Sequence, residues 1–154
     1  MLEDVNLGEQ SVADHRGLAP DATLDELYRR AEALRGARVL HINATPFGGG
    51  VTELLRSAVP LLRDLGLVAD WKIIHGDQRF FETTKRVHNG LQGAERGLDA
   101  GDRDAFLEAS QENARRLEEE YDFVFVHDPQ PEALRHLRGG VRGVGPGLAR
   151  VVEQ

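Results

Sequence analysis

The apolar positions between residues 38 and 66 change period within a short stretch. Residues 39–42 hold a mostly apolar run, which is typical of a strand covered on both faces. Three glycines follow at 48–50, and apolar residues then recur at helical spacing from Val51 to Leu65. The pattern predicts a buried strand, a sharp glycine turn and an amphipathic helix. An anion is expected to dock at the turn, because a helix N-terminus offers unpaired N–H groups and partial positive charge.

Further elements are expected on both sides of this unit. A helix is predicted from Thr23, whose spacing to Glu26 fits a capping box, to Gly36. Apolar runs at 68–74 and 123–126 predict two more strands. Other helices are predicted over 80–91, over 102–120 and from Pro131. A strand–helix–strand unit has a right-handed crossover and parallel strands, so the expected fold class is α/β, a Rossmann-like three-layer sandwich with a mainly parallel sheet.

Composition sets the expected domain limits. The chain has 154 residues, which suits a single domain. Residues 1–22 mix Gly, Asp and Pro with scattered apolar side chains and are expected to form a lead-in arm. Residues 23–138 hold the predicted helices and strands. Residues 139–154 are rich in glycine and lack apolar periodicity, so a disordered tail is predicted there.

Charge and residue types exclude several classes of function. The formal net charge of -7 argues against general nucleic-acid binding, which needs clustered Lys and Arg. No apolar run approaches the roughly 20 residues of a membrane span, and the acidic N-terminus does not resemble a signal peptide, so a cytoplasmic location is expected. The chain has no cysteine, which excludes disulfides and thiol catalysis. His75 with Asp77, and His127 with Asp128, supply too few ligands at a recognisable spacing, so no metal site is predicted.

The glycine turn fits neither of the common nucleotide-binding motifs. A P-loop needs Lys and then Ser or Thr after its last glycine, whereas Gly50 is followed by Val51 and Thr52. Gly48 and Gly50 match the first two glycines of the dinucleotide motif, but its third position is Glu53. An NAD-type dinucleotide-binding domain therefore remains an alternative, and an ATPase is disfavoured.

Three longer motifs carry a resemblance to a known family. They are an Asn-x-Thr-Pro-x-Gly-Gly-Gly-Val loop at 43–51, a Phe-Phe-x-x-Thr-Lys-x-x-His-Asn-x-Leu-Gln-Gly helix at 80–93 and a His-Asp-Pro-Gln-Pro loop at 127–131. With their surroundings, at 36–93 and 121–134, they resemble the N-terminal half of trehalose-forming retaining glycosyltransferases. These are the glycosyltransferring trehalose synthases and the related retaining trehalose phosphorylases. The resemblance covers roughly half of the chain.

The resemblance implies a GT-B enzyme, in which two Rossmann-like domains face each other across a cleft. The N-terminal domain mainly holds the acceptor sugar and the C-terminal domain the nucleotide sugar. The implied reaction transfers glucose from a nucleoside diphosphate glucose to the anomeric hydroxyl of glucose, giving trehalose with retention and no required metal or other cofactor. The implied catalytic groups are the N–H groups at Gly49 and Gly50, which would stabilise the leaving phosphate, and His127, which would reach the transferred sugar.

The same match implies a set of substrate-binding residues. They are Asn43, Thr45, Gly48, Val51, Lys85, His88, Asn89, Gln92, Asp128 and Gln130. Lys85, His88, Asn89 and Gln92 would line the acceptor pocket, because their polar side chains suit the recognition of sugar hydroxyls by convergent hydrogen bonds. Other roles stay open: Asn43 and Thr45 also fit a turn, and residues 85–92 also fit a solvated helix face. His41 and Trp71 lie within predicted strands and are interpreted as core residues.

A GT-B enzyme has a second domain of comparable size, and the resemblance to the first ends near Leu137. The chain alone is therefore expected to be inactive and to need a donor domain in trans. A stand-alone sugar or nucleotide binding module without turnover is the main alternative. The expected ligands are glucose, trehalose and a nucleotide sugar, and a homodimer is expected through an unpaired sheet edge.

Overall fold

The structure is a computed structural model that describes residues 2–93, 97–128, 130–134 and 150–152. In these residues one sheet has the strand order β1-β3-β2-β4-β5. The strands are β1 (Glu3–Asp4), β2 (Arg38–Asn43), β3 (Val68–Ile73), β4 (Phe123–Val126) and β5 (Arg150–Val152). All neighbouring pairs are parallel except β1 with β3, which is antiparallel. The predicted α/β class with a mainly parallel sheet is confirmed.

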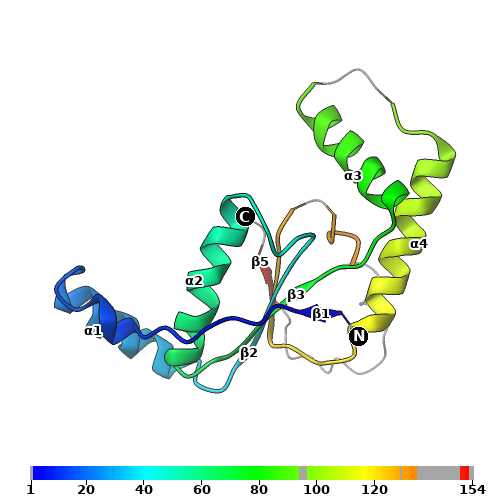
Figure 1. Ribbon diagram of the computed structural model, residues 1–154. Helices are drawn as coiled ribbons and strands as arrows, with labels where there is room; N and C mark the ends of the chain where they lie inside the picture. The colour runs from blue at the N-terminus through cyan, green and yellow to red at the C-terminus, as the bar shows by residue number, and fades with distance from the viewer. Residues whose placement is uncertain (1, 94–96, 129, 135–149, 153–154) are drawn as a thin grey trace.

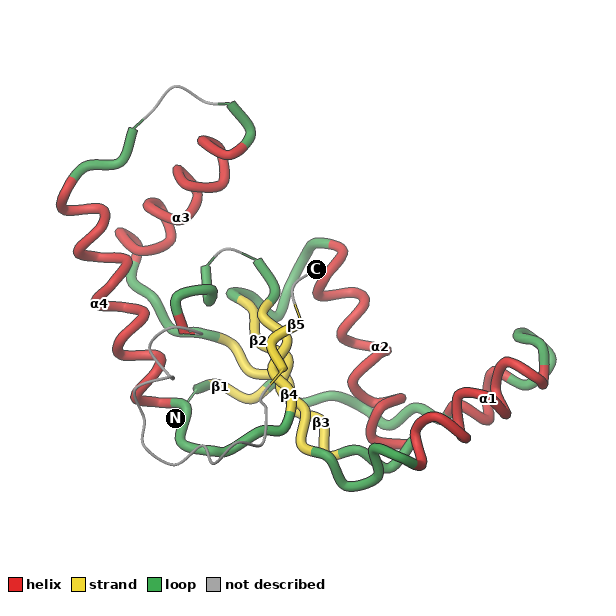
Figure 2. Tube along the Cα trace, turned by 180° about the vertical axis from the view of Figure 1, so that it is seen from behind, coloured by secondary structure: helices red, strands yellow, loops and turns green. Residues whose placement is uncertain are grey.

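Helices lie on both faces of this sheet (Figure 1). The described helices are η1 (Val12–His15), α1 (Asp21–Glu32), α2 (Gly50–Asp64), α3 (Gln78–Leu91) and α4 (Ala100–Arg116). In both views the sheet lies between α2 on one side and α4 on the other, which is the predicted three-layer sandwich (Figures 1 and 2). The helix α3 packs against α4, and both extend beyond the edge of the sheet. None of the described helices is long and apolar enough to cross a membrane.

The alternation of side chains along β2 explains the two cores. Val39 faces α2 and packs with Leu55 and Val59 of that helix. Leu40 and Ile42 face the opposite side and belong to a second cluster near α4. Successive strand residues point to opposite faces of the sheet. A strand with apolar residues at both odd and even positions is therefore buried on both faces. The apolar run at 39–42 therefore predicted a central strand correctly.

The predicted capping box at Thr23 is wrong. The helix α1 begins at Asp21 with Pro20 at its N-cap, so Thr23 lies inside the first turn. Glu26 instead accepts hydrogen bonds from Arg29 and Arg30. Proline explains the earlier start, because its fixed φ suits a helix entry and it leaves no N–H to satisfy. The capping box occurs at α4, where Asp99 and Asp102 accept each other's backbone N–H groups.

Both ends of the chain contribute a strand to the sheet. Residues 2–22 of the predicted lead-in arm are tied to the domain, because β1 pairs with β3 and Leu2 and Val12 are buried. Residues 150–152, expected within a disordered tail, pair as β5 with β4. The exposed N–H and C=O groups of a sheet edge favour such pairing. The remainder of 139–154 lies outside the described residues. Most of the helix predicted from Pro131 also lies outside them, and residues 130–133 form a turn.

Candidate functional site

The carboxyl ends of β3, β2 and β4 are aligned at one edge of the sheet. Asn43 at the end of β2 pairs with Ile73 at the end of β3. On the other side, the backbone N–H of His127 donates to the carbonyl of Ile42 at 2.9 Å. The loop before α2 and the residues after β4 therefore lie beside each other. This is the edge at which parallel α/β sheets bind ligands.

Polar side chains shape the turn between β2 and α2. The buried Asn43 donates from Nδ2 to the carbonyl of Thr45 at 2.9 Å and accepts at Oδ1 from the indole N–H of Trp71. Thr45 Oγ1 donates to the carbonyl of Phe47 and accepts from its N–H. Thr52 in the first turn of α2 donates to the same Thr45 carbonyl. Asn43 and Thr45 thus take the turn-forming role that the sequence left open, and their contact with a ligand stays a prediction.

The glycines of the turn are required by backbone conformation. Gly48 has φ +71° and Gly49 has φ +82° with ψ 157°, a combination that side chains rarely adopt. A Cβ added at either residue would meet no atom within 4 Å, so space is not the constraint. Gly49 is the N-cap of α2 and offers no capping side chain, and Gly50 begins the helix. The first N–H groups of a helix have no acceptor within it, so those of Gly50 and Val51 are available to an anion.

His127 forms a buried pair with His41. Nδ1 of His41 lies 3.0 Å from Nε2 of His127, and the ring centroids are 5.3 Å apart with nearly parallel planes. The ring of Phe125 also stacks on the His41 ring, at a centroid distance of 4.8 Å. His41 comes from the middle of β2, and His127 directly follows β4. His41 therefore connects the predicted catalytic residue, His127, to the interior of the sheet.

Burial favours the neutral form of both histidines in this pair. Burial lowers the pKa of His41 to about 4, and the neighbouring His127 adds to the shift. Burial also lowers the pKa of His127, and the Asp128 carboxylate opposes that shift. Each ring then carries one proton, so one ring donates to the other. Asp128 is exposed and has φ +70°, an uncommon value for a residue with a side chain.

The other predicted binding residues lie apart from the glycine turn. Lys85, His88, Asn89 and Gln92 are exposed on α3 or at its C-cap, and His88 contacts Gln92 at 3.1 Å. No described hydrogen bond or ion pair joins any of the four to the turn or to His127. Gln130 is half-buried, and its Oε1 has no hydrogen-bond partner among the described residues. Sugar binding by these residues stays a prediction.

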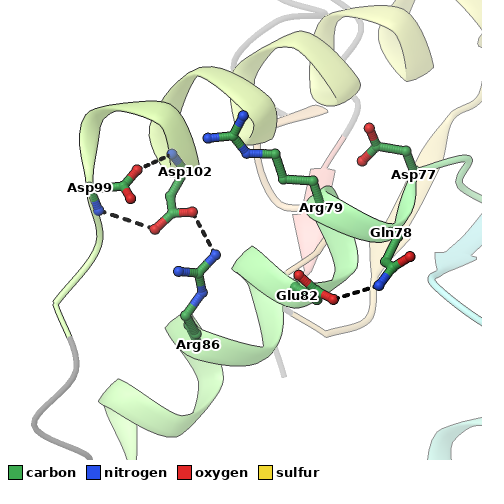
Figure 3. Close-up of a pocket in the computed structure, with 7 residues that line it drawn as sticks. All are labelled: Asp77, Gln78, Arg79, Glu82, Arg86, Asp99 and Asp102. Carbon is green, nitrogen blue, oxygen red and sulfur yellow. Dashed lines mark hydrogen bonds and ion pairs between the residues drawn. The ribbon is translucent and has the colours of Figure 1, made fainter.

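A separate charged hollow of about 610 Å³ lies between α3 and α4 (Figure 3). Its lining residues are Asp77, Gln78, Arg79, Glu82, Arg86, Asp99 and Asp102. The buried Asp102 accepts from Arg86 at 2.6 Å and from the Thr83 hydroxyl at 3.2 Å. The Asp99 backbone N–H, which also donates to this carboxylate, is the main cause of its lowered pKa, and Arg86 contributes. No predicted site residue lines this hollow, and its contacts hold the two helices together. No described group of His, Asp and Glu could hold a metal.

Sequence reasoning missed the pairing of His41. The interpretation of His41 as a buried core residue is correct, yet its hydrogen-bond partner is the predicted catalytic histidine. The available signal was weak: a histidine two residues before the end of one strand and another directly after a later strand. The two residues meet only because β2 and β4 are neighbours in the sheet, which the sequence does not specify.

A Rossmann-like domain with a glycine turn and a histidine at adjacent strand ends belongs to the α/β class that binds ligands at one sheet edge. Comparison with known proteins specifies the family. Residues 41–143 match a protein-family model described as the N-terminal domain of trehalose synthase. The chain therefore belongs to the trehalose synthase N-terminal domain family.

Individual relatives support this assignment. The chain is 49% identical to trehalose synthase of Rubrobacter xylanophilus over 144 residues, which cover 92% of the chain and 35% of the relative. It is 38% identical to trehalose synthase of Pyrococcus horikoshii over 86% of the chain and 32% of that protein. It is 41% identical to trehalose synthase of Thermococcus litoralis over 79% of the chain and 30% of that protein. The chain thus spans about a third of the length of these relatives.

Proposed function

We propose that this chain is the acceptor-side domain of a retaining glycosyltransferase that makes trehalose from a nucleoside diphosphate glucose and glucose. The observation that supports this proposal is the backbone bond from His127 to Ile42, which holds His127 at the end of the strand that leads into the glycine turn. Membership of the trehalose synthase N-terminal domain family supports the choice of sugar. The fold of the domain suits one half of a GT-B enzyme.

The proposed chemistry divides between two groups. The leaving phosphate gains negative charge as the bond to glucose breaks, and the N–H groups at Gly49, Gly50 and Val51 would stabilise it. His127 would donate or accept a hydrogen bond at the transferred sugar. Asp128 and Gln130 follow it in the same loop and would contact hydroxyls. The resemblance assigns Lys85, His88, Asn89 and Gln92, which α3 presents, to the acceptor pocket.

The donor side of the reaction needs a further domain. We propose that a nucleotide-sugar domain, in a longer chain or in trans, completes the site and that residues 1–154 alone do not turn over. The proposed reaction requires no metal or other cofactor. The proposed location is the cytoplasm. A homodimer also stays a proposal, checked by size-exclusion chromatography. Because β5 pairs with β4, self-association at that edge of the sheet would involve β5.

Calorimetric titration tests the acceptor-side assignment. Glucose and trehalose are expected to bind the purified chain, whereas UDP-glucose and ADP-glucose are expected to bind weakly and to lose that binding in Gly49→Val. Glu112→Gln, which changes an exposed carboxylate on α4, is the control and should bind every ligand as the parent does. Tight binding of NAD without binding of sugars would contradict the proposal and favour a dinucleotide-binding domain.

A second measurement separates an enzyme half from a binding module. Adding a donor domain from a trehalose synthase relative should restore trehalose formation from nucleoside diphosphate glucose and glucose. Sugar binding without turnover under these conditions would favour the module.

A further inference from the structure

The ring of His41 is held in one orientation by its neighbours. The Phe125 ring stacks on it with an interplanar angle of 9°, and Nδ1 is directed at Nε2 of His127. The other ring nitrogen of His41, Nε2, is buried and has no hydrogen-bond partner among the described residues. The position of the single proton on the neutral His41 ring therefore decides whether Nε2 is a buried donor or a buried acceptor.

Two proton arrangements satisfy the 3.0 Å contact. If Nε2 of His127 donated, the neutral His41 ring would carry its own proton on Nε2, as a buried N–H without an acceptor. If Nδ1 of His41 donates, the same Nε2 is a bare acceptor. Orphaned buried N–H groups are rarer than under-satisfied acceptors. The second arrangement is therefore favoured, and His127 then carries its proton on Nδ1.

We propose that His41 is a positioning residue that donates its Nδ1–H to Nε2 of His127 and thereby fixes His127 as an Nδ1–H hydrogen-bond donor. This inference rests on the proposed function in one respect: the oxygen that receives the bond is a hydroxyl of the sugar. The ring nitrogen that a histidine presents is set by the bond that its other nitrogen makes. The carboxyl end of β4 thus presents a donor rather than an acceptor to the ligand.

The ¹⁵N spectrum of the histidine rings tests this tautomer directly, because protonated and unprotonated ring nitrogens have well-separated shifts. In the whole 154-residue chain near neutral pH, His127 should show a protonated Nδ1 and an unprotonated Nε2. His41 should show a protonated Nδ1. An Nε2–H tautomer of His127 in the unmodified chain would overturn the proposal, whatever the sugar-binding result.

Two variants test the role of His41. His41→Phe keeps an aromatic ring on Phe125 but removes the donor, so the His127 signals should shift toward a mixture of tautomers. His41→Asn places an amide N–H near the position of Nδ1 and should restore the Nδ1–H tautomer. His75→Phe, an exposed histidine after β3, is the control and should leave the His127 signals unchanged. Unchanged His127 signals in a folded His41→Phe chain would contradict the proposal.

A glucose titration separates this inference from the proposed function. Glucose should shift the Nδ1 signal of His127, and His41→Phe should weaken glucose binding about tenfold, the loss expected for one hydrogen bond, with most of it recovered in His41→Asn. A fixed Nδ1–H tautomer with no response to glucose or trehalose would refute sugar binding while supporting the role of His41. If His41→Phe does not fold, the spectra of the unmodified chain and of His41→Asn still decide the tautomer.

Discussion

Trp71 donates its indole N–H to Oδ1 of Asn43 at a distance of 2.8 Å. The indole comes from β3 and the amide from the end of β2, and each residue is only 1% exposed. Asn43 donates in turn to the Thr45 carbonyl, so the first bend of the glycine turn is connected to the core. A residue interpreted as plain core therefore sets the geometry of the candidate site.

Trp71→Phe should lower the free energy of unfolding by more than the smaller size of the phenylalanine side chain alone would explain. The substitution leaves Oδ1 of Asn43 buried without its donor, which costs about 1–3 kcal/mol. Urea denaturation of Trp71→Phe, Asn43→Leu and the double variant isolates this interaction, because the cavity cost is common to both arms of the cycle. A coupling energy below about 0.5 kcal/mol would show that the bond contributes little.

Gly49 and Gly50 should differ in their tolerance of alanine. Both have open space around a Cβ, but only Gly49 has a positive φ. Gly49→Ala should lower the free energy of unfolding by about 1–3 kcal/mol, the usual cost of such backbone strain. Gly50→Ala lies in the first turn of α2 and should be neutral or stabilising by up to about 1 kcal/mol. Equal denaturation midpoints for the two variants would argue against a left-handed conformation at Gly49.

The fold was predictable where the sequence pattern is local. The apolar run at 39–42 and the helical spacing from Val51 identified β2 and α2, because each depends on neighbouring residues alone. The pairing of Glu3–Asp4 with β3 was not predictable, since both residues are exposed and show no alternation. The strand pairing at 150–152 likewise depends on the free edge of β4, which only the assembled sheet provides.

The same distinction applies to the candidate site. The glycine turn follows from three consecutive glycines before a helix, and the structure has it at the predicted place. The pair of His41 and His127 depends on the order of strands, so no local pattern could reveal it. Likewise the double use of the Asn43 amide depends on the register between β2 and β3.

Asp102→Asn should loosen the pair formed by α3 and α4. The carboxylate receives bonds from Arg86, from Thr83 and from the backbone of Asp99, so loss of its charge weakens several contacts together. Thermal unfolding should show a Tm lower by several degrees. Glu112→Gln, whose carboxylate pairs with arginines on the exposed side of α4, should change Tm little, because surface ion pairs contribute little. Equal effects of the two substitutions would contradict a structural role for the α3–α4 hollow.

The stability of the domain should fall as the pH decreases from 7 to 5, and His41 should account for part of that fall. An unfolded histidine binds a proton near pH 6.5, whereas burial lowers the pKa of His41 to about 4 in the folded chain. Between these values the unfolded state binds more protons, so the free energy of unfolding rises with pH. The contribution of His41 between pH 7 and pH 5 is about 2 kcal/mol at most.

Urea denaturation at both pH values measures this contribution. His41→Phe removes the group that resists protonation, so its free energy of unfolding should fall less between pH 7 and pH 5 than that of the unmodified chain. Carboxyl groups titrate in both proteins and cancel in the difference. His75→Phe is the control and should keep the pH dependence of the unmodified chain. Equal pH dependence in His41→Phe and in the unmodified chain would show that His41 is protonated in the folded state as readily as in water.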